Sequence, residues 1–249
     1  MAAFNIVLHG IGQWFCFGGA LGARILFRRS AVDSVVIGFC ALFANTVLLG
    51  LPIHERAYGT AALAPNFAII ALHAPFCYLI GITTMEIVRA DRTNLATLVP
   101  QVGKAIFSNA LMIGIALGFA VNLSGVILPM VVTDALDLMI RAALPAALFG
   151  LGGVLYRYRP EGDAMVIGFV CILSLILHPA IGYGIGRGVA TLSDDQLRAV
   201  VVTAAMPPGI NTYIFANMYG AARRVAASSL LIGTALTVIT AAVWIAVLP

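Results

Sequence analysis

The sequence predicts an all-α membrane protein of about eight transmembrane helices, two of them broken. The 249-residue chain is 61% hydrophobic and only 10% charged, with a mean hydropathy of +1.04. This composition leaves too little polar surface to cover a water-soluble domain, whereas long apolar helices suit a bilayer. Proline, glycine and asparagine interrupt two of the apolar segments, near residues 45–52 and 207–211.

The expected crossings follow from the length of each apolar run, because about 20 residues of α-helix span the hydrocarbon core. The eight runs are 4–27, 31–53, 60–88, 103–123, 126–156, 164–186, 196–219 and 225–248. The connections between them are short, so consecutive helices are expected to lie antiparallel and side by side.

Lys and Arg residues are distributed unequally between the two sides of the membrane. Ten lie in the odd-numbered connections and three on the other side. The ten are Arg24, Arg28, Arg29, Arg89, Arg92, Lys104, Arg157, Arg159, Arg223 and Arg224, and the three are Arg56, Arg187 and Arg198. The positive-inside rule therefore predicts that both termini lie outside the cytoplasm. Because orientation accounts for the basic residues, no nucleic-acid partner is expected.

Two of the spans cannot form continuous helices. Pro207, Pro208 and Gly209 interrupt the seventh, and Gly50 and Pro52 interrupt the second. Proline removes a backbone donor and clashes with the preceding turn, and unpaired backbone groups are costly in hydrocarbon unless they line a cavity. The two spans run in opposite directions, which predicts an inverted repeat whose broken helices cross near the bilayer centre. This arrangement is typical of secondary transporters.

Each break carries an Asn-Thr pair, Asn45-Thr46 and Asn211-Thr212. An amide can donate to a carboxylate without a buried countercharge, and the N-terminus of a half-helix offers free N–H groups to an anion. The pairs therefore predict a binding site for a small organic anion. The alternative is that the four side chains only cap the opened backbone.

The remaining candidates for chemistry are two histidines. His73 in the third span and His178 in the sixth are the groups at depth that titrate near neutral pH, so they are candidates for a proton relay. The alternative is a neutral imidazole bonded to a nearby carbonyl. No carboxylate pair lies at a break, which argues against a sodium/proton exchanger. The sequence contains no enzyme or metal-binding motif, so no catalytic residue, metal or cofactor is expected.

Three segments, taken in order, resemble the auxin efflux carrier family. They are FANTVLLGLP at 43–52, ALPAALFGLGGVL at 143–155 and AAMPPGINTYIFANMYG at 204–220, followed by a small-residue final helix at 226–240. The resemblance covers nearly the whole chain. It implies a ten-span fold of two inverted five-span halves and transport of an organic anion, as in bacterial malonate-type carriers and plant PIN proteins.

The chain departs from that pattern at its start. It divides into 1–89 with three spans, a cytoplasmic connection at 90–102, and a complete five-span half at 103–249, an incomplete repeat of three plus five. The two missing spans would belong, with 103–156, to a scaffold. Either the start was assigned downstream of the true one, or a shortened homologue replaces the scaffold by forming a homodimer. The coupling ion, H+ or Na+, stays open. The alternative to a transporter is a homologue that acts as a ligand sensor or assembly partner.

Overall fold

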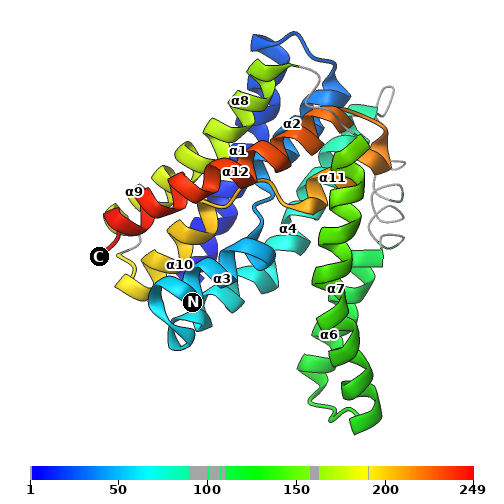
Figure 1. Ribbon diagram of the computed structural model, residues 1–249, viewed down its shortest axis with the longest axis vertical. Helices are drawn as coiled ribbons and strands as arrows, with labels where there is room; N and C mark the ends of the chain where they lie inside the picture. Colours follow the sequence, from blue (N-terminus) through cyan, green and yellow to red (C-terminus); the bar gives the residue numbers. More distant parts are fainter. Residues whose placement is uncertain (1, 90–99, 101–106, 108–109, 158–162, 190) are drawn as a thin grey trace.

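The computed structural model describes residues 2–89, 100, 107, 110–157, 163–189 and 191–249, which are almost entirely helical (Figure 1). Within these residues the β-structure is an isolated bridge between Ala44 and Pro208. Apart from Pro100, the predicted connection 90–102 lies outside the described residues, as do Lys104 and Arg159. The all-helical part of the fold prediction is confirmed.

The first part of the chain forms four α-helices, the second and third of which belong to one broken span. The elements are α1 (Ala2–Leu26), α2 (Ala31–Leu42), a π-helical turn η1 (Thr46–Gly50), α3 (Leu51–Tyr58), a 3-10 turn η2 (Thr60–Leu63) and α4 (Ala64–Arg89). Residues between α2 and η1 are extended rather than helical.

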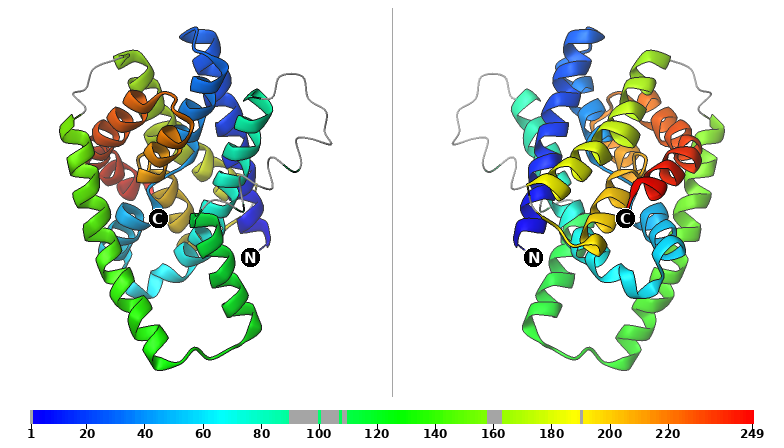
Figure 2. Two further views of the ribbon diagram at one scale, coloured as in Figure 1. Left: turned by 90° about the vertical axis from the view of Figure 1, so that its right-hand side faces the viewer. Right: turned by 90° about the vertical axis from the view of Figure 1, so that its left-hand side faces the viewer.

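The second part contains the hairpin of α6 and α7 and then the helices α8 to α12, with a non-helical gap between α10 and α11. Its elements are α6 (Ala110–Ser124), α7 (Met130–Arg157), α8 (Ala164–Ile172), a π-helical turn η3 (Leu173–Leu177), α9 (His178–Gly188), α10 (Asp194–Ala204), α11 (Ile210–Tyr219) and α12 (Arg223–Val247). The loop end of the α6–α7 hairpin extends below the other helices, as Figures 1 and 2 show from different sides.

Local sequence signals explain several helix ends. Ser30 precedes α2, and its hydroxyl oxygen accepts a hydrogen bond from the amide of Asp33 at 3.0 Å. Ser193 and Gln196 form a reciprocal capping box at the start of α10. Gly220 ends α11 with a φ of 69°, a left-handed conformation that glycine adopts without strain. Such caps satisfy amides and carbonyls that a helix terminus leaves unpaired.

Three helical segments in the described part of the chain are long and apolar enough to cross a membrane. They are Thr60–Arg89, Ala164–Gly188 and Arg223–Val247. The chain is thus an integral membrane protein by the composition of its helices, and the 25 residues of α12 rise roughly 38 Å, more than the hydrocarbon thickness. The count of eight spans and their inverted repeat remain predictions.

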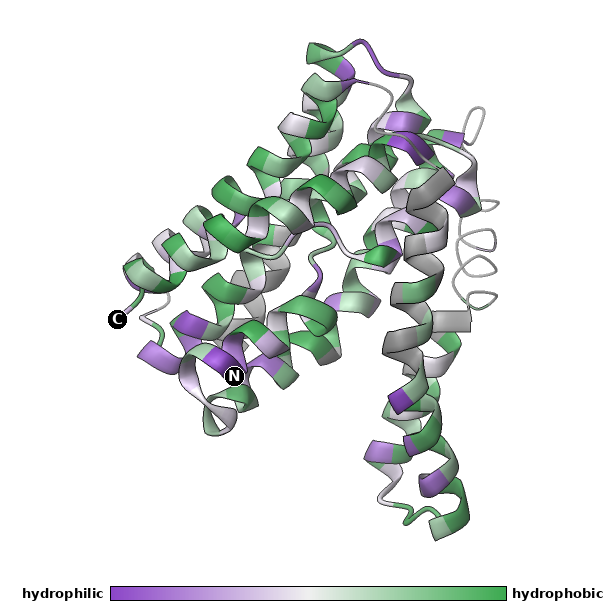
Figure 3. Cartoon of the chain, viewed as in Figure 1, coloured by the Kyte–Doolittle hydropathy of each residue, from purple (hydrophilic) through white to green (hydrophobic). Residues whose placement is uncertain are grey.

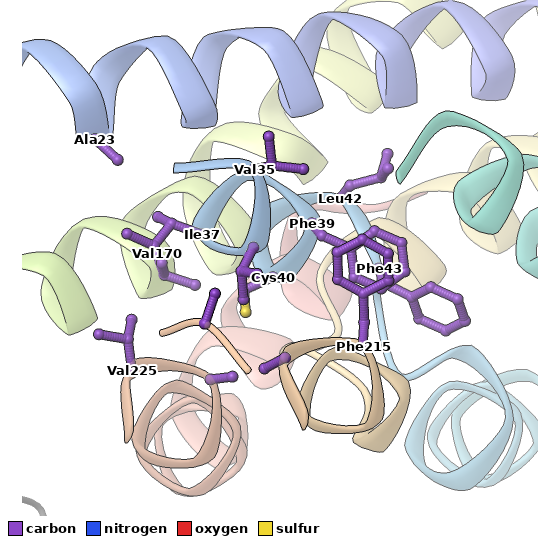
Figure 4. Packing of buried hydrophobic residues seen from close by; sticks show 14 of the residues in the cluster. Ala23, Val35, Ile37, Phe39, Cys40, Leu42, Phe43, Val170, Phe215 and Val225 are labelled. Atoms are coloured by element: carbon purple, nitrogen blue, oxygen red, sulfur yellow. The ribbon is translucent and has the colours of Figure 1, made fainter. Parts of the chain in front are cut away.

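Aromatic side chains hold α2, α4 and α11 together. The rings of Phe39 and Phe215 stack with centroids 4.0 Å apart, and Tyr78 meets Phe39 edge-on at 5.5 Å. Phe43 joins the same cluster at the end of α2 (Figure 4). Stacked and edge-to-face aromatic pairs contribute about 0.5–1.5 kcal/mol beyond the area that they bury. The cluster therefore anchors the two broken spans beside one another.

Hydrophilic residues lie at the two ends of the helix bundle and along the α6–α7 hairpin (Figure 3). At one end Arg29 pairs with Asp163, and the Asp33 carboxylate accepts a hydrogen bond from the Ala222 amide at 2.9 Å. Arg89 lies over the Tyr219 ring at the same end. At the other end Arg198 lies over the Tyr58 ring, and its Nε donates to the Pro249 carbonyl at 2.7 Å, which places the C-terminus there.

Candidate functional site: the crossing of two broken helices

The two broken spans meet through their backbones. The Asn45 amide donates to the Pro207 carbonyl at 2.8 Å, and the Gly209 amide donates to the Phe43 carbonyl at 2.9 Å. These two hydrogen bonds form the antiparallel bridge between Ala44 and Pro208. Four backbone groups that the breaks leave without helical partners thus satisfy one another, which lowers the cost of opening a helix inside a membrane.

The second break lies where the sequence predicts it. The helix α10 ends at Ala204 and α11 begins at Ile210, so Pro207, Pro208 and Gly209 all lie in the gap. A Cβ atom added to Gly209 would lie 3.5 Å from the Ala44 carbonyl oxygen and the Asn45 Cα. These are ordinary van der Waals distances, so the two backbones lie in direct contact at Gly209.

The first break differs from the prediction in its position. The chain opens at Phe43–Asn45, whereas Gly50 and Pro52 lie in helical structure, in η1 and at the second residue of α3. The Gly50 amide donates to the Asn45 carbonyl at 3.1 Å, five residues back, which widens this turn. Because Pro52 lies within the first turn of α3, its missing N–H and its ring are tolerated without a gap. The prediction that Gly50 and Pro52 form the opening is therefore wrong.

A second π-helical turn precedes a proline in the sixth span. The turn η3 is followed by His178 and Pro179, as η1 is followed by Leu51 and Pro52. In a helix, proline leaves unpaired the carbonyl four residues earlier, which is that of Leu175. The indole Nε1 of Trp244 in α12 donates to this carbonyl at 2.9 Å. Trp244 thus satisfies the group that Pro179 frees.

The two Asn-Thr pairs lie on either side of the bridge. Asn45 immediately precedes η1, and Asn211 is the second residue of α11. Both asparagine side chains are half-buried, and among the described contacts neither amide group forms a hydrogen bond that caps the opened backbone. Thr212 differs, because its buried hydroxyl donates to the Gly209 carbonyl at 2.7 Å. Thr46 is buried, and its amide donates to the Ala44 carbonyl.

The four side chains differ in their contacts. The Thr212 hydroxyl donates to a carbonyl at the break, so it supports the local backbone without capping a free amide. The amides of Asn45 and Asn211 lie beside the first turns of η1 and α11, where N–H groups lack helical acceptors and the helix dipole is positive. The arrangement can donate several hydrogen bonds to an anion from two half-helices at once.

The two predicted histidines line one small cavity. It measures about 20 Å³ and is also lined by Thr203, by Ala44 in the bridge and by Ala204 before the second break. His178 is 6% exposed, and its ring packs against the Phe15 ring at 4.8 Å. His73 is less buried, and its Nδ1 lies 3.7 Å from the Cys77 Sγ.

Sequence reasoning missed two polar residues near this cavity. Asn66 in α4 is buried, and its Nδ2 donates to the Thr203 hydroxyl oxygen at 3.2 Å. Asn66 directly follows Pro65, and Thr203 lies four residues before Pro207, so each polar side chain near a proline was an available signal. Among the described residues, no three His, Cys, Asp or Glu side chains gather closely enough to hold a metal ion.

A match to a known protein family identifies the class of protein that contains this crossing. A family model described as Membrane transport protein matches residues 1–245. The chain belongs to this family of membrane transporters. The match confirms the predicted resemblance to auxin efflux carriers, and the family's activity is transport rather than enzymatic catalysis.

One curated relative of this transporter is a protein named Putative malonate transporter from Rhizobium meliloti (strain 1021). It is 22% identical over 239 residues, which cover 95% of this chain and 74% of the relative.

Proposed function

We propose that this membrane transport protein is a secondary carrier of a small organic anion that works by alternating access. The observation that carries the proposal is the crossing itself. Two half-helices begin beside the bridge, and two asparagine amides without a capping role lie next to their first turns. In transporters, broken helices of this kind place the substrate near the bilayer midplane.

Asn45 and Asn211 are proposed to donate hydrogen bonds to the substrate carboxylate, with Thr46 and Thr212 holding the opened backbone beside it. Pro207, Pro208 and Gly209 keep α10 and α11 apart, so that the N-terminus of α11 faces the anion. Hydrogen bonds to a charged group contribute about 1.5–3 kcal/mol each, which is enough for selective binding without a buried cation.

The proposal includes an orientation in the bacterial inner membrane. The connections that carry Arg24, Arg28, Arg29, Arg89 and Arg223 lie at one end of the bundle, as the contacts among their neighbours indicate. The C-terminus lies at the opposite end, beside Arg198. If the basic end is cytoplasmic, the C-terminus faces away from the cytoplasm. The same antiparallel relation of the two breaks supports an inverted repeat of 1–89 and 103–249.

The α6–α7 hairpin is the proposed scaffold against which the crossing helices move. Several of its large apolar side chains are exposed, Leu138, Met139 and Phe149 among them. In a monomer, lipid covers this apolar surface. In a homodimer, the hairpin of a second copy packs against it. Molecular mass measured in detergent and in nanodiscs distinguishes the two arrangements.

Transport in proteoliposomes tests the function. Malonate is the first anion to test because the relative's name includes it, followed by other small mono- and dicarboxylates. Uptake of the labelled anion that is accelerated by unlabelled anion on the opposite side is the expected result for a carrier. Binding without any exchange would instead favour a sensor or an assembly partner. No binding of any carboxylate would remove the proposed anion site.

A further inference from the structure

The cavity beside the crossing has the size and the polar groups to hold one water molecule. It measures about 20 Å³, and His73 from α4, His178 from α9 and Thr203 from α10 all face it. A water molecule needs at least 10–15 Å³ of such space and two to four polar partners. Because the Asn66 amide already donates to the Thr203 oxygen at 3.2 Å, the Thr203 hydroxyl hydrogen remains able to donate into the cavity.

His178 supplies the observation that points to a ligand in this cavity. The residue is 6% exposed, and its Nδ1 has no hydrogen-bond partner among the described protein atoms. A buried ring nitrogen without a partner is unfavourable in an apolar interior. A water molecule in the cavity can satisfy it and can connect it to the imidazole of His73.

The electrostatic surroundings restrict what the cavity can bind. Of the described residues that line it, His73, His178 and Cys77 are titratable, and none is Asp, Glu, Lys or Arg. The element α1 contributes the Phe15 ring, and α2 and α10 contribute apolar side chains besides Thr203. Hard metal ions prefer oxygen ligands, of which the cavity offers one side-chain hydroxyl. An imidazole pair instead suits a proton, and two protons would repel each other.

We propose that the cavity holds a single proton, shared through a water molecule between His73 and His178, and that this proton accompanies the organic anion bound at the crossing. The inference rests on the proposed transport function and identifies its coupling ion. A hydronium ion from one aqueous side gives its proton to a ring nitrogen, and the imidazolium returns that proton to water on the other side.

The position of the cavity explains how the two ligands would be coupled. Ala44 pairs with Pro208 in the bridge, and Ala204 ends α10 just before the second break. The proton's positive charge therefore lies beside the backbone that carries Asn45. Opposite charges attract strongly where water is scarce. Anion binding thus favours protonation of the cavity, and by reciprocity a lower pH strengthens anion binding until the anion itself is protonated.

Calorimetry with the purified full-length protein tests this coupling. Malonate and other two- to six-carbon mono- and dicarboxylates are titrated near pH 7 in buffers of different ionisation enthalpy, which reports the protons taken up per anion bound. We expect uptake approaching one proton per anion in the unmodified protein. We expect proton uptake to be at least fivefold smaller in His178→Gln and in His73→Gln. Both variants should still bind the anion, with lower affinity than the unmodified protein.

His54→Gln is the matched control, because His54 is also buried but lies in α3 against the Tyr58 ring, away from the cavity. Its proton uptake should equal that of the unmodified protein. Monodispersity and melting of each variant establish folding. If only one of the two cavity variants folds, that variant alone decides the test. Anion binding without proton uptake, or full uptake in a folded cavity variant, overturns the inference and leaves the carrier function standing. If no carboxylate binds, the proposed anion site fails and the inference fails with it.

Discussion

At the scale of single residues, Asn45 and Asn211 decide whether the crossing binds an anion. If their amides donate to a carboxylate, Asn→Asp at either position places like charges close together in a poorly screened site, at a cost of several kcal/mol. Loss of one charge-assisted hydrogen bond in Asn→Ala costs about 1.5–3 kcal/mol. The Asp variants should therefore bind the anion more weakly than the Ala variants, as measured by equilibrium binding at pH 7.

Asn217→Asp provides the control for this comparison, because Asn217 is exposed on the same helix, α11. It should change affinity little. A capping role reverses the order at the two test positions, since Asp is a good acceptor at a helix N-terminus and Ala is not. If the Ala variants bind the anion more weakly than the Asp variants at both sites, the asparagines have a structural role.

Gly233 in α12 shows how tightly the second break is enclosed. A Cβ atom added there would lie 3.1 Å from the Pro207 Cβ and 3.2 Å from the Pro208 Cδ, and neither proline ring can rotate away. Gly233→Ala should therefore destabilise the protein by about 1–3 kcal/mol, seen as a lower melting temperature in detergent. Gly168→Ala in α8, where a Cβ would meet nothing within 4 Å, should be neutral or slightly stabilising. Equal effects would mean that α12 does not pack against the break as described.

At the scale of elements, the gap between α10 and α11 depends on two consecutive prolines. Replacing Pro207 and Pro208 together with Ala restores two backbone donors and removes the ring clashes, so the span should close toward a continuous helix. The bridge to Phe43 and Asn45 would then be lost. We expect expression to survive and anion binding to fall below detection. Unchanged affinity would exclude the broken helix from the binding mechanism.

A different element, the turn before α9, is stabilised by a group from another helix. Trp244→Phe removes the donor to the Leu175 carbonyl and should cost about 1–3 kcal/mol, because that carbonyl is left unpaired. In a Pro179→Ala background the backbone amide gained at position 179 can donate to Leu175, so the same tryptophan substitution should cost less. A double-mutant cycle on melting free energies should give a coupling of about 1 kcal/mol. If the effects of the two substitutions on the free energy of unfolding are strictly additive, Trp244 does not satisfy the carbonyl that Pro179 frees.

At the scale of the whole molecule, the orientation prediction follows from the basic end of the bundle. In a background without native cysteines, a cysteine at Arg224 should be protected from an impermeant thiol reagent in intact cells. A cysteine at Arg56, in the last turn of α3, should react readily. Both positions are exposed, so accessibility depends on the side of the membrane. The opposite labelling pattern would reverse the proposed topology.

Sequence patterns predicted the helical class, the family and the second break, because these depend on composition and on the local chemistry of Pro207 and Pro208. The first break was misplaced by several residues. Its position depends on two hydrogen bonds with a segment far along the chain, one donated by the Asn45 amide and one accepted by the Phe43 carbonyl, and no local rule contains them. The shared cavity of His73 and His178 was likewise beyond prediction, because residues of four helices, α2, α4, α9 and α10, line it.

The backbone pairing of the two breaks also has a consequence for how the protein is made. Ribosomes deliver α2 and α3 to the membrane well before residues 207–209 have been synthesised, so the Phe43 carbonyl and the Asn45 amide emerge without their partners. Polar backbone groups in that state are not stable against lipid. The first broken span is therefore expected to stay near water or within the insertion machinery until the second arrives. Insertion of this transporter would then be completed late, once residues 207–209 have been synthesised and the two breaks can pair.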